Sequence, residues 1–219
     1  MDFAAARRRM VDGQLKPNRV TDPRILLAFE DLPRERFVAP ALAVRALSDE
    51  DLPLGGGRVL LQPMSLAKLI QLASPRAGDR ALVLGAGVGY GAAILARLGL
   101  EVTAVEDAAA LLAHAEAALP LCGLPAGAIR VVAANPAAAP DGGPYDVILI
   151  EGAVPAVPHP ISGALAEGGR LVTVRRTPAE PGSAILGRRA GGAFSVSEAF
   201  DCRTALLPAF APAPRFDFA

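Results

Sequence analysis

Histidine and cysteine are scarce in this chain of 219 residues, which has two of each. Cys122 and Cys202 are far apart and show no spacing typical of metal ligands, so we interpret them as two ordinary thiols in a reducing cytosol. His114 and His159 offer little material for a zinc site or for a hydrolytic triad built on histidine. The sequence therefore predicts no metal site, marks no Ser-His-Asp or Cys-His hydrolase, and favours a cytoplasmic protein.

An excess of charge of either sign is also absent, because 22 basic residues balance 22 acidic ones. Such a chain has no overall electrostatic field that would attract nucleic acid or an anionic membrane. The run Arg7-Arg8-Arg9 fits a solvated helix face better than a phosphate-binding patch. We therefore expect neither nucleic acid nor a membrane among the partners.

Long apolar runs are missing too, although 52% of the residues are hydrophobic and the mean hydropathy is +0.37. A membrane-spanning helix needs about 18 to 20 apolar residues in succession, and Arg, Gly or Pro interrupts the longest apolar windows well before that length. No apolar stretch follows the basic residues near the N-terminus, so a secretory signal is not indicated. We interpret the chain as a soluble protein with one domain and additional segments packed on it.

The first sixty residues differ in pattern from the rest of the chain. Residues 2–12 are expected to be helical, and Thr21-Asp22-Pro23 predicts the start of a second helix, because Thr or Asp can cap it and Pro is tolerated in its first turn. Gly55-Gly56-Gly57 predicts a flexible turn. We predict a helical cap over residues 1–60, packed on a core domain of residues 61–219 with which it forms one structural unit.

From residue 62 onward, apolar segments alternate between helical spacing and short buried strands. Nearly unbroken apolar strand cores between helices predict a parallel sheet covered on both faces. The fold class is therefore α/β, with a doubly wound, mostly parallel sheet, and the tail 208–219 is expected to lie over the surface. The expected helices are one that ends near Pro75 and those at 92–98, 108–119 and 161–166, and the expected strands are 81–84, 102–105, 129–133, 147–150, 170–174, 184–187 and 194–200.

A glycine-rich turn, Gly85-Ala86-Gly87-Val88-Gly89-Tyr90, directly follows the first strand of this sheet. In a doubly wound sheet the ligand binds at the carboxyl ends of the strands, where the strand order reverses. Glycines there allow a sharp turn and a close approach of backbone to ligand. The methyltransferase pattern G-x-G-x-G fits at Gly85, Gly87 and Gly89. The dinucleotide pattern G-x-G-x-x-G fails in that frame because of Tyr90, and it survives only in a frame that begins two residues later. The turn thus favours S-adenosylmethionine and leaves a nicotinamide-dependent oxidoreductase as the weaker alternative.

Glu106 ends the second strand, 21 residues after Gly85. An acid at that point can accept hydrogen bonds from both ribose hydroxyls of such a ligand. The alternative is an ordinary acid at the start of the following helix, where the helix dipole favours negative charge. The coincidence of strand end and glycine spacing favours the first interpretation.

Several short motifs occur in a consistent order between about residues 10 and 175. They are Met10-Val11-Asp12, Asp22-Pro23-Arg24-Ile25-Leu26, Leu32-Pro33-Arg34-Glu35-Arg36-Phe37-Val38, Asp51-Leu52-Pro53-Leu54-Gly55, Gln62-Pro63, the turn with its Tyr90, Tyr145-Asp146-Val147-Ile148-Leu149-Ile150 and Leu165-Ala166-Glu167-Gly168-Gly169-Arg170-Leu171-Val172. Together they resemble the protein-L-isoaspartate O-methyltransferase family. The resemblance implies a seven-stranded, Rossmann-like methyltransferase sheet with S-adenosylmethionine as cofactor. It also implies methyl transfer to the side-chain-derived carboxyl group of isomerised aspartyl residues, with an isoaspartyl-containing protein or peptide as the partner and protein repair as the outcome.

Three positions depart from the family pattern. Leu61 stands where the family's active-site Ser is expected, so no catalytic residue is assigned. Asn135-Pro136 replaces the Asp-Gly pair that binds adenine in the family, although an Asn side chain can still bond an adenine amino group. Val83 replaces the acid often found two positions before the first glycine. The resemblance and the turn together assign cofactor binding to Gly85, Gly87, Gly89, Tyr90, Glu106 and Asn135.

The loss of a hydroxyl at Leu61 bears on the methyl acceptor. A carboxylate is ionised at neutral pH and needs no general base, and in-line transfer depends mainly on proximity and alignment. A hydroxyl would position and solvate the carboxylate, which Leu61 cannot do. The sequence leaves open a weaker isoaspartyl enzyme, a methyltransferase with a more apolar acceptor, and a cofactor-binding pseudo-enzyme.

Overall fold

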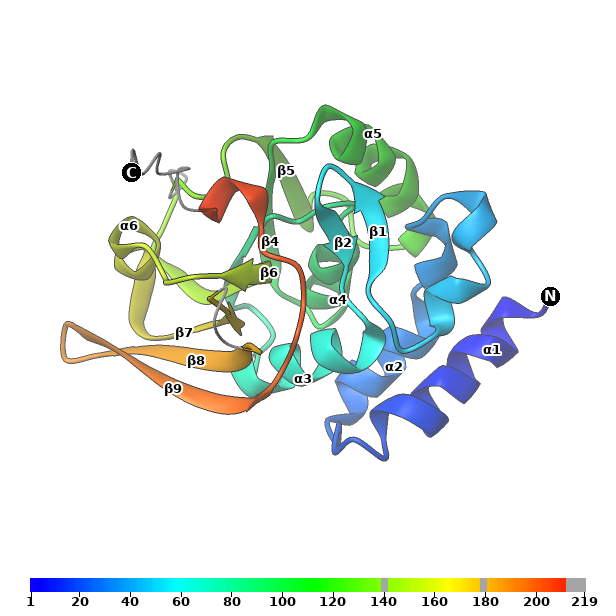
Figure 1. Ribbon diagram of the computed structural model, residues 1–219, viewed down its shortest axis with the longest axis horizontal. Helices are drawn as coiled ribbons and strands as arrows, with labels where there is room; N and C mark the ends of the chain where they lie inside the picture. Colours follow the sequence, from blue (N-terminus) through cyan, green and yellow to red (C-terminus); the bar gives the residue numbers. More distant parts are fainter. Residues whose placement is uncertain (139–141, 178–180, 212–219) are drawn as a thin grey trace, which may run out of the picture.

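A seven-stranded sheet lies at the centre of the computed structural model, which describes residues 1–138, 142–177 and 181–211 (Figure 1). The strand order is β5-β4-β3-β6-β7-β8-β9. The pairs from β5 to β7 are parallel, and β8 and β9 add an antiparallel hairpin at one edge. This confirms the α/β class and the mostly parallel sheet. The bounds are β3 Arg80–Leu84, β4 Glu101–Glu106, β5 Ile129–Ala133, β6 Tyr145–Val154, β7 Leu165–Arg175, β8 Ser183–Ala190 and β9 Ala193–Asp201.

The order of the strands reverses between β3 and β6. From β3 the chain adds β4 and then β5 on one side, and it crosses to the other side for β6 and β7. Leu82 pairs with Thr103 of β4 and with Ile148 of β6, so β3 is central and its core residues 81–84 are buried. The carboxyl ends of β3 and β6 therefore border the crevice where doubly wound folds bind ligands.

Helices cover both faces of the sheet, as the apolar pattern predicts. Their bounds are α3 Pro63–Ala73, α4 Tyr90–Arg97, α5 Ala109–Ala118 and α6 His159–Gly163, with a 3-10 turn at Leu119–Cys122. The sixth helix is earlier and shorter than the expected 161–166. Pro158 and Pro160 favour a helix start there, and Leu165 already pairs with Tyr145 as the first residue of β7.

The N-terminal region is helical at first and ends in a small hairpin. Asp2 caps α1 by accepting from the Ala5 N–H, and Asp22 caps α2 by accepting from the Arg24 N–H, so Asp22 rather than Thr21 is the cap. The bounds are α1 Phe3–Met10, a π-helical turn Val11–Leu15, α2 Pro23–Asp31, 3-10 turns at Arg34–Arg36, Pro40–Leu42 and Arg45–Leu47, and an antiparallel pair β1 Leu52–Gly55 and β2 Arg58–Leu60.

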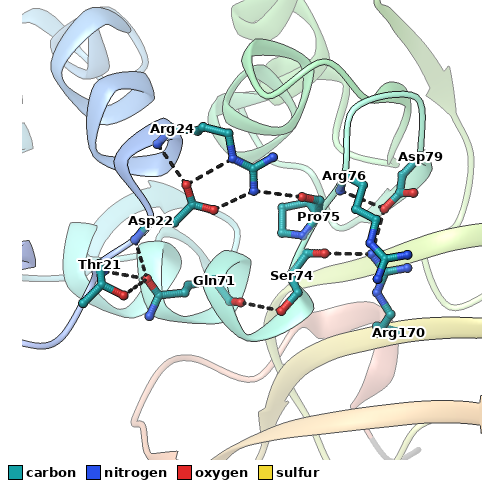
Figure 2. A network of polar contacts seen from close by, with 9 residues as sticks. All are labelled: Thr21, Asp22, Arg24, Gln71, Ser74, Pro75, Arg76, Asp79 and Arg170. Carbon is teal, nitrogen blue, oxygen red and sulfur yellow. Dashed lines mark hydrogen bonds and ion pairs between the residues drawn. The ribbon is translucent and has the colours of Figure 1, made fainter.

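Polar contacts tie the start of α2 to the end of α3 and to β7 (Figure 2). The Gln71 Oε1 atom accepts from the backbone N–H groups of Thr21 and Asp22, at 2.7 and 3.1 Å. Arg170 of β7 donates to the Ser74 carbonyl and to Asp79. One apolar cluster also contains both N-terminal residues such as Phe29 and core residues such as those of α3 and α4. The N-terminal region thus packs directly on the sheet, while the boundary near residue 60 stays a prediction.

The chain after β9 does not simply lie over the surface. Residues 202–210, called the C-terminal strap below, run from β9 across the carboxyl end of β6 and finish in a 3-10 turn at Pro208–Phe210 (Figure 1). Phe210 is buried, because it packs into the apolar cluster beneath β6. The expectation of a surface tail is therefore wrong for Phe210, whereas Pro208 is exposed as expected, and residues 212–219 lie outside the described part.

Within the described residues, no helix has the length and apolar character needed to cross a membrane. In the same part of the chain, no three His, Cys, Asp or Glu residues gather in the manner of a metal site.

Candidate functional site

The glycine turn joins the carboxyl end of β3 to the start of α4. Gly85, Gly87 and Gly89 have φ angles of 66°, 56° and 87°, which favour glycine over residues with a side chain. The Ala86 N–H donates to the Val105 carbonyl of β4, so the turn is anchored to the neighbouring strand. The three glycines therefore occupy the crevice at the reversal of strand order, as the sequence predicts.

Glu106 lies beside this turn at the end of β4, with only 1% of its surface exposed. Its Oε2 atom accepts from the Gly87 N–H at 2.7 Å. Its Oε1 atom accepts from the N–H groups of Asp107 and Ala108, at 3.0 and 3.1 Å, just before α5. Both interpretations of Glu106 therefore have geometric support, since the carboxylate faces the turn and also bonds the start of the helix.

Arg58 of β2 pairs with Glu106 through both terminal nitrogens of its guanidinium group. The Nη1 to Oε1 distance is 2.8 Å and the Nη2 to Oε2 distance is 2.6 Å, and both side chains are buried. This bidentate arrangement is the strong form of an arginine–carboxylate contact. The carboxylate expected to hold a ribose is thus already neutralised by a residue of the same chain.

Leu207 of the C-terminal strap fills the space between the ends of β3 and β6. A Cβ atom on Gly152 would lie 2.5 Å from the Leu207 Cγ atom, and one on Gly85 would lie 3.0 Å from its Cδ1 atom. The Gly85 position is equally close to the Arg58 Nη2 atom, at 3.0 Å. Glycine at both strand ends is therefore what allows Leu207 and Arg58 to reach the crevice.

The residues around this turn have the chemical groups that bind a nucleoside cofactor. In this conformation, however, they leave too little space for one. The glycine backbone and the Glu106 carboxylate are the groups such a ligand needs. Arg58 and Leu207, however, occupy the volume directly over Gly85, and the Leu207 side chain is only 3% exposed. In this conformation the crevice is closed by the chain itself.

A cavity of about 350 Å³ opens on the outer side of Arg58. The β1–β2 turn, Arg58, the residues from Asp107 to Leu111 and Pro208 of the strap line it. A larger cavity of about 500 Å³ lies away from the turn, between the N-terminal region and α5. We give the smaller cavity more weight as the outer part of the ligand site, because it adjoins the Glu106–Arg58 pair.

A buried acid, Glu151, lies behind the turn in the carboxyl-terminal half of β6. Burial raises the pKa of Glu151 to about 8, and the charges of Arg58 and Arg34 oppose that rise. Its carboxylate is so close to α4 that a Cβ atom on Gly91 would lie 1.9 Å from the Oε1 atom. At neutral pH the Glu151 side chain is therefore mostly protonated.

The remaining predicted residues lie in different surroundings. The Tyr90 ring is buried between Phe29 and Phe37, with the Arg34 guanidinium 4.9 Å from its centre, so it packs toward the N-terminal region. Asn135 is exposed, and its Oδ1 atom accepts from the Ala137 N–H at 2.9 Å.

Leu61 is fully buried, and its carbonyl accepts from Arg34 Nη2 at 2.6 Å. The turn and Glu106 are thus brought together, whereas the side chains of Tyr90 and Leu61 belong to the packed interior.

Three residues of the site were missed by the sequence analysis: Arg58, Glu151 and Leu207. Glu151 had a usable signal, because it interrupts an otherwise apolar run at the end of a predicted strand. Arg58 and Leu207 had none, since each reaches the turn only through folding of a distant segment.

Comparison with known proteins places these features in a family. The chain matches the family profile of Protein-L-isoaspartate(D-aspartate) O-methyltransferase over residues 6–184. The protein-L-isoaspartate O-methyltransferase of Methylorubrum extorquens (strain PA1) is 42% identical over 171 residues, which are 78% of this chain and 74% of that protein. The enzyme of the same name from Koribacter versatilis (strain Ellin345) is 35% identical over 202 residues, 92% of this chain and 90% of that one.

A solved structure has the same fold. A Plasmodium falciparum structure assigned as a protein-L-isoaspartate O-methyltransferase, in complex with S-adenosyl-L-homocysteine, superposes with a TM-score of 0.77. The match covers 93% of this chain and 98% of that one, at 16% identity. At that identity the likeness concerns the fold alone.

Proposed function

The chain belongs to the protein-L-isoaspartate O-methyltransferase family, and on that premise we propose that it methylates the side-chain-derived carboxyl group of isoaspartyl residues in proteins, with S-adenosylmethionine as donor. It is a methyltransferase of the Rossmann-like class. The observation that carries the proposal is the meeting of the glycine turn and Glu106 at the reversal of strand order, within a chain that matches the family from residue 6 to residue 184.

We assign the cofactor contacts to the backbone of the glycine turn and to the Glu106 carboxylate rather than to the aromatic side chain of Tyr90. Gly85, Gly87 and Gly89 would let the cofactor approach the backbone, and Glu106 would accept from its ribose hydroxyls once Arg58 has released the carboxylate. Asn135 is exposed beyond the end of β5 and remains the candidate for an adenine contact. Tyr90 supports the turn from behind, because its ring is buried against the N-terminal region.

The acceptor side of the site lacks the family's hydroxyl. Leu61 donates no hydrogen bond from its side chain, so an isoaspartyl carboxylate would need another donor there. Leaving a buried carboxylate short of a donor costs about 1–3 kcal/mol, which corresponds to slower transfer rather than to a different reaction. A pseudo-enzyme is not favoured, because curated relatives about 40% identical over three quarters of the chain carry the enzyme's name.

The partner is proposed to be an isoaspartyl-containing protein or peptide, in keeping with the names of the relatives. We also propose a cytoplasmic location. Cys122 and Cys202 are both free thiols, which is the usual state in a reducing compartment.

The test is transfer of a labelled methyl group from S-adenosylmethionine to an isoaspartyl peptide, with the normal aspartyl peptide as control. We expect label on the isoaspartyl peptide alone, as a base-labile ester, and suppression of the signal by excess S-adenosyl-L-homocysteine. Equal labelling of both peptides, or no labelling by protein whose far-ultraviolet ellipticity shows it to be folded, would contradict the proposed reaction.

A further inference from the structure

Two adjoining cavities lie beside the C-terminal half of α3, away from the crevice. One of about 300 Å³ opens between the end of α3 and the strands β7 and β8, and one of about 430 Å³ extends along the helix toward β9. Leu72, Ser74 and Arg188 line both cavities. Arg76, which lines the smaller one, precedes β3, whereas the glycine turn follows the opposite end of that strand. The cavities are therefore separate from the proposed cofactor site.

All charged residues that line the two cavities are basic. They are Arg19, Lys68, Arg76, Arg170 and Arg188. Among the described residues, the acid that pairs with one of these side chains is Asp79, whose Oδ2 atom accepts from Arg170 Nη2 at 2.7 Å. The chain as a whole is balanced, with 22 basic and 22 acidic residues. The cavities therefore concentrate positive charge on a protein whose formal net charge is zero.

Arg170 and Arg188 lie directly opposite each other on the antiparallel strands β7 and β8. The side chains of such a pair point to the same face of the sheet, and like charges there are destabilising. Arg170 has a structural role, because it donates to the carbonyls of Ala73 and Ser74 at the end of α3 and to Asp79 (Figure 2). The Arg188 side chain is exposed and makes no hydrogen bond or ion pair within residues 1–138, 142–177 and 181–211. The fold thus explains the first guanidinium group but not the second.

The unused donors around the smaller cavity fit a phosphate group. Arg170 bonds its partners through Nε and Nη2, and its Nη1 atom makes no hydrogen bond within the described chain. In the same part of the chain Arg76 donates only from its backbone, to Asp79. With Arg188, three guanidinium groups thus offer N–H donors to one small space. A phosphate dianion has nearly two charges and three acceptor oxygens, and guanidinium groups bind it in a bidentate manner.

The larger cavity has an apolar wall next to these arginines. Leu72, Leu186 and Phe200 line it, and the Lys68 Nζ atom lies 4.0 Å from the centre of the Phe200 ring. Because the two cavities join at Leu72 and Arg188, a ligand whose phosphate contacts the arginines can place a short aromatic or apolar group along this wall. The pair of cavities thus favours an organic phosphate over a bare anion.

We infer that the cavities beside α3 bind a small phosphomonoester. Its phosphate contacts Arg76, Arg170 and Arg188. Its apolar part lies beside Leu186 and Phe200. The phosphate neutralises the guanidinium groups that face each other across β7 and β8, while Arg170 keeps its bonds to the end of α3. This site does not depend on the proposed methyl transfer, so the two can fail independently.

Calorimetric titration of the full chain with phenyl phosphate tests this inference, at about 0.1 M ionic strength, where charges more than about 10 Å away are screened. Inorganic phosphate lacks the ring, and benzoate has the ring but a single charge. We expect each of them to bind at least about tenfold more weakly than phenyl phosphate. Equal binding of the three anions, or no binding of phenyl phosphate by the folded chain, would overturn the inference.

Arg188→Gln removes the guanidinium group without a partner in the described chain, and we expect it to weaken phenyl phosphate binding at least about tenfold. Arg189→Gln is the matched control. It changes the charge equally one residue further along β8, but Arg189 donates to the carbonyls of Ser162 and Gly163 beside α6. We expect its affinity to stay within about twofold of that of the unchanged chain. An equal loss in both variants would reduce the effect to net charge and contradict a site.

A second measurement separates this role of Arg188 from a purely structural one. Without ligand, Arg188→Gln removes one of two opposed like charges, so its unfolding temperature should exceed that of the unchanged chain. Phenyl phosphate should raise the unfolding temperature of the unchanged chain and leave that of Arg188→Gln nearly the same. An equal or lower temperature for the ligand-free variant would mean that the fold itself accommodates Arg188, which overturns the premise of the inference.

A single-stranded oligonucleotide is the last probe, because its phosphates are also recognised by arginine. We expect it to bind no more tightly than phenyl phosphate, since two small cavities hold one phosphate rather than a chain of them. Tighter binding of the oligonucleotide that Arg188→Gln abolishes would assign the cavities to nucleic acid and reject the small phosphomonoester.

Discussion

Among the single residues, the two acids at the crevice differ in their partners. Glu106 accepts from Arg58 and from three backbone N–H groups. Glu151 is buried against α4, and burial raises its pKa to about 8 against the attraction of Arg58 and Arg34. The Glu106 carboxylate is thus surrounded by donors, whereas the surroundings of Glu151 favour its protonated form.

The raised pKa of Glu151 makes the stability of the protein depend on pH. Its pKa is about 8 in the folded chain, compared with an ordinary value of 4.5. Between these values the folded state holds a proton that the unfolded state has lost. The free energy of unfolding should therefore fall as pH rises from about 5 to 8, with a slope approaching 1.4 kcal/mol per pH unit. Glu151→Gln should remove most of that slope in urea titrations at several pH values.

Glu101→Gln is the control for this measurement, because Glu101 is exposed at the start of β4. It should leave the pH dependence as it is in the unchanged chain. Parallel stability curves for the unchanged chain and Glu151→Gln would show that Glu151 is ionised in the folded state after all.

How much of the site could be predicted from the sequence depended on the distance between its parts along the chain. The glycine turn follows β3 and Glu106 ends the adjacent strand β4. The number of residues between them and the predicted strand ends were therefore enough to place them together. Arg58 and Leu207 come from the hairpin before β3 and from the strap after β9, and no local pattern relates them to Gly85. For that reason the sequence does not predict that these two residues fill the crevice.

At the level of helices and strands, uninterrupted apolar runs were the most reliable signal. The run 147–150 lies within the longer β6. The strand predicted at 129–133 has the bounds of β5, although Arg130 interrupts its apolar residues. The strands predicted at 184–187 and 194–200 lie within β8 and β9, although β8 is buried only over its residues 184–187 and most of β9 is exposed. The strap has no periodicity at all, and its place is set by contacts with Gly152 and Ala153.

Helix α4 contains a glycine, Gly91, whose role is to admit the carboxyl group of Glu151. In an ordinary helix, Gly→Ala stabilises by about 1 kcal/mol. Here the added Cβ atom would lie 1.9 Å from the Glu151 Oε1 atom, so Gly91→Ala should instead destabilise the protein by about 1–3 kcal/mol. In a Glu151→Ala background the same substitution should become neutral or stabilising, and urea unfolding of the four proteins measures this coupling.

Gly163→Ala in α6 is the control for Gly91→Ala, since nothing lies within 4 Å of the Cβ atom it would add. It should be neutral or stabilising in both backgrounds. A stabilising Gly91→Ala in the unchanged chain would show that α4 and Glu151 are not in contact.

For the whole molecule, the question is whether the N-terminal region and the sheet unfold together. Tyr90 begins α4 of the core but packs between Phe29 and Phe37 of the N-terminal region. The buried Arg34 also joins the two parts, since it donates to the carbonyls of Ala46 and Leu61. Such shared packing predicts a single cooperative transition.

The absence of tryptophan makes this prediction easy to test, because the chain has only two tyrosines. In Tyr145→Phe the emission comes from Tyr90 alone and reports on the contact between the N-terminal region and the core. We expect its denaturant midpoint to coincide with that of the far-ultraviolet ellipticity of the same variant. Tyr90→Phe, which keeps Tyr145 within the sheet, should behave likewise. A Tyr90 transition that precedes the ellipticity change would mean that residues 1–60 detach first.

Burial of Leu207 and Phe210 in the strap has a consequence for the heat capacity of unfolding. Exposure of apolar surface to water raises the heat capacity. When the strap unfolds with the sheet, two large apolar side chains return to water, which adds on the order of 0.1 kcal/mol/K to the heat capacity of unfolding. The Leu207→Ala protein, which has less apolar surface to expose, should therefore show a smaller heat capacity of unfolding in scanning calorimetry.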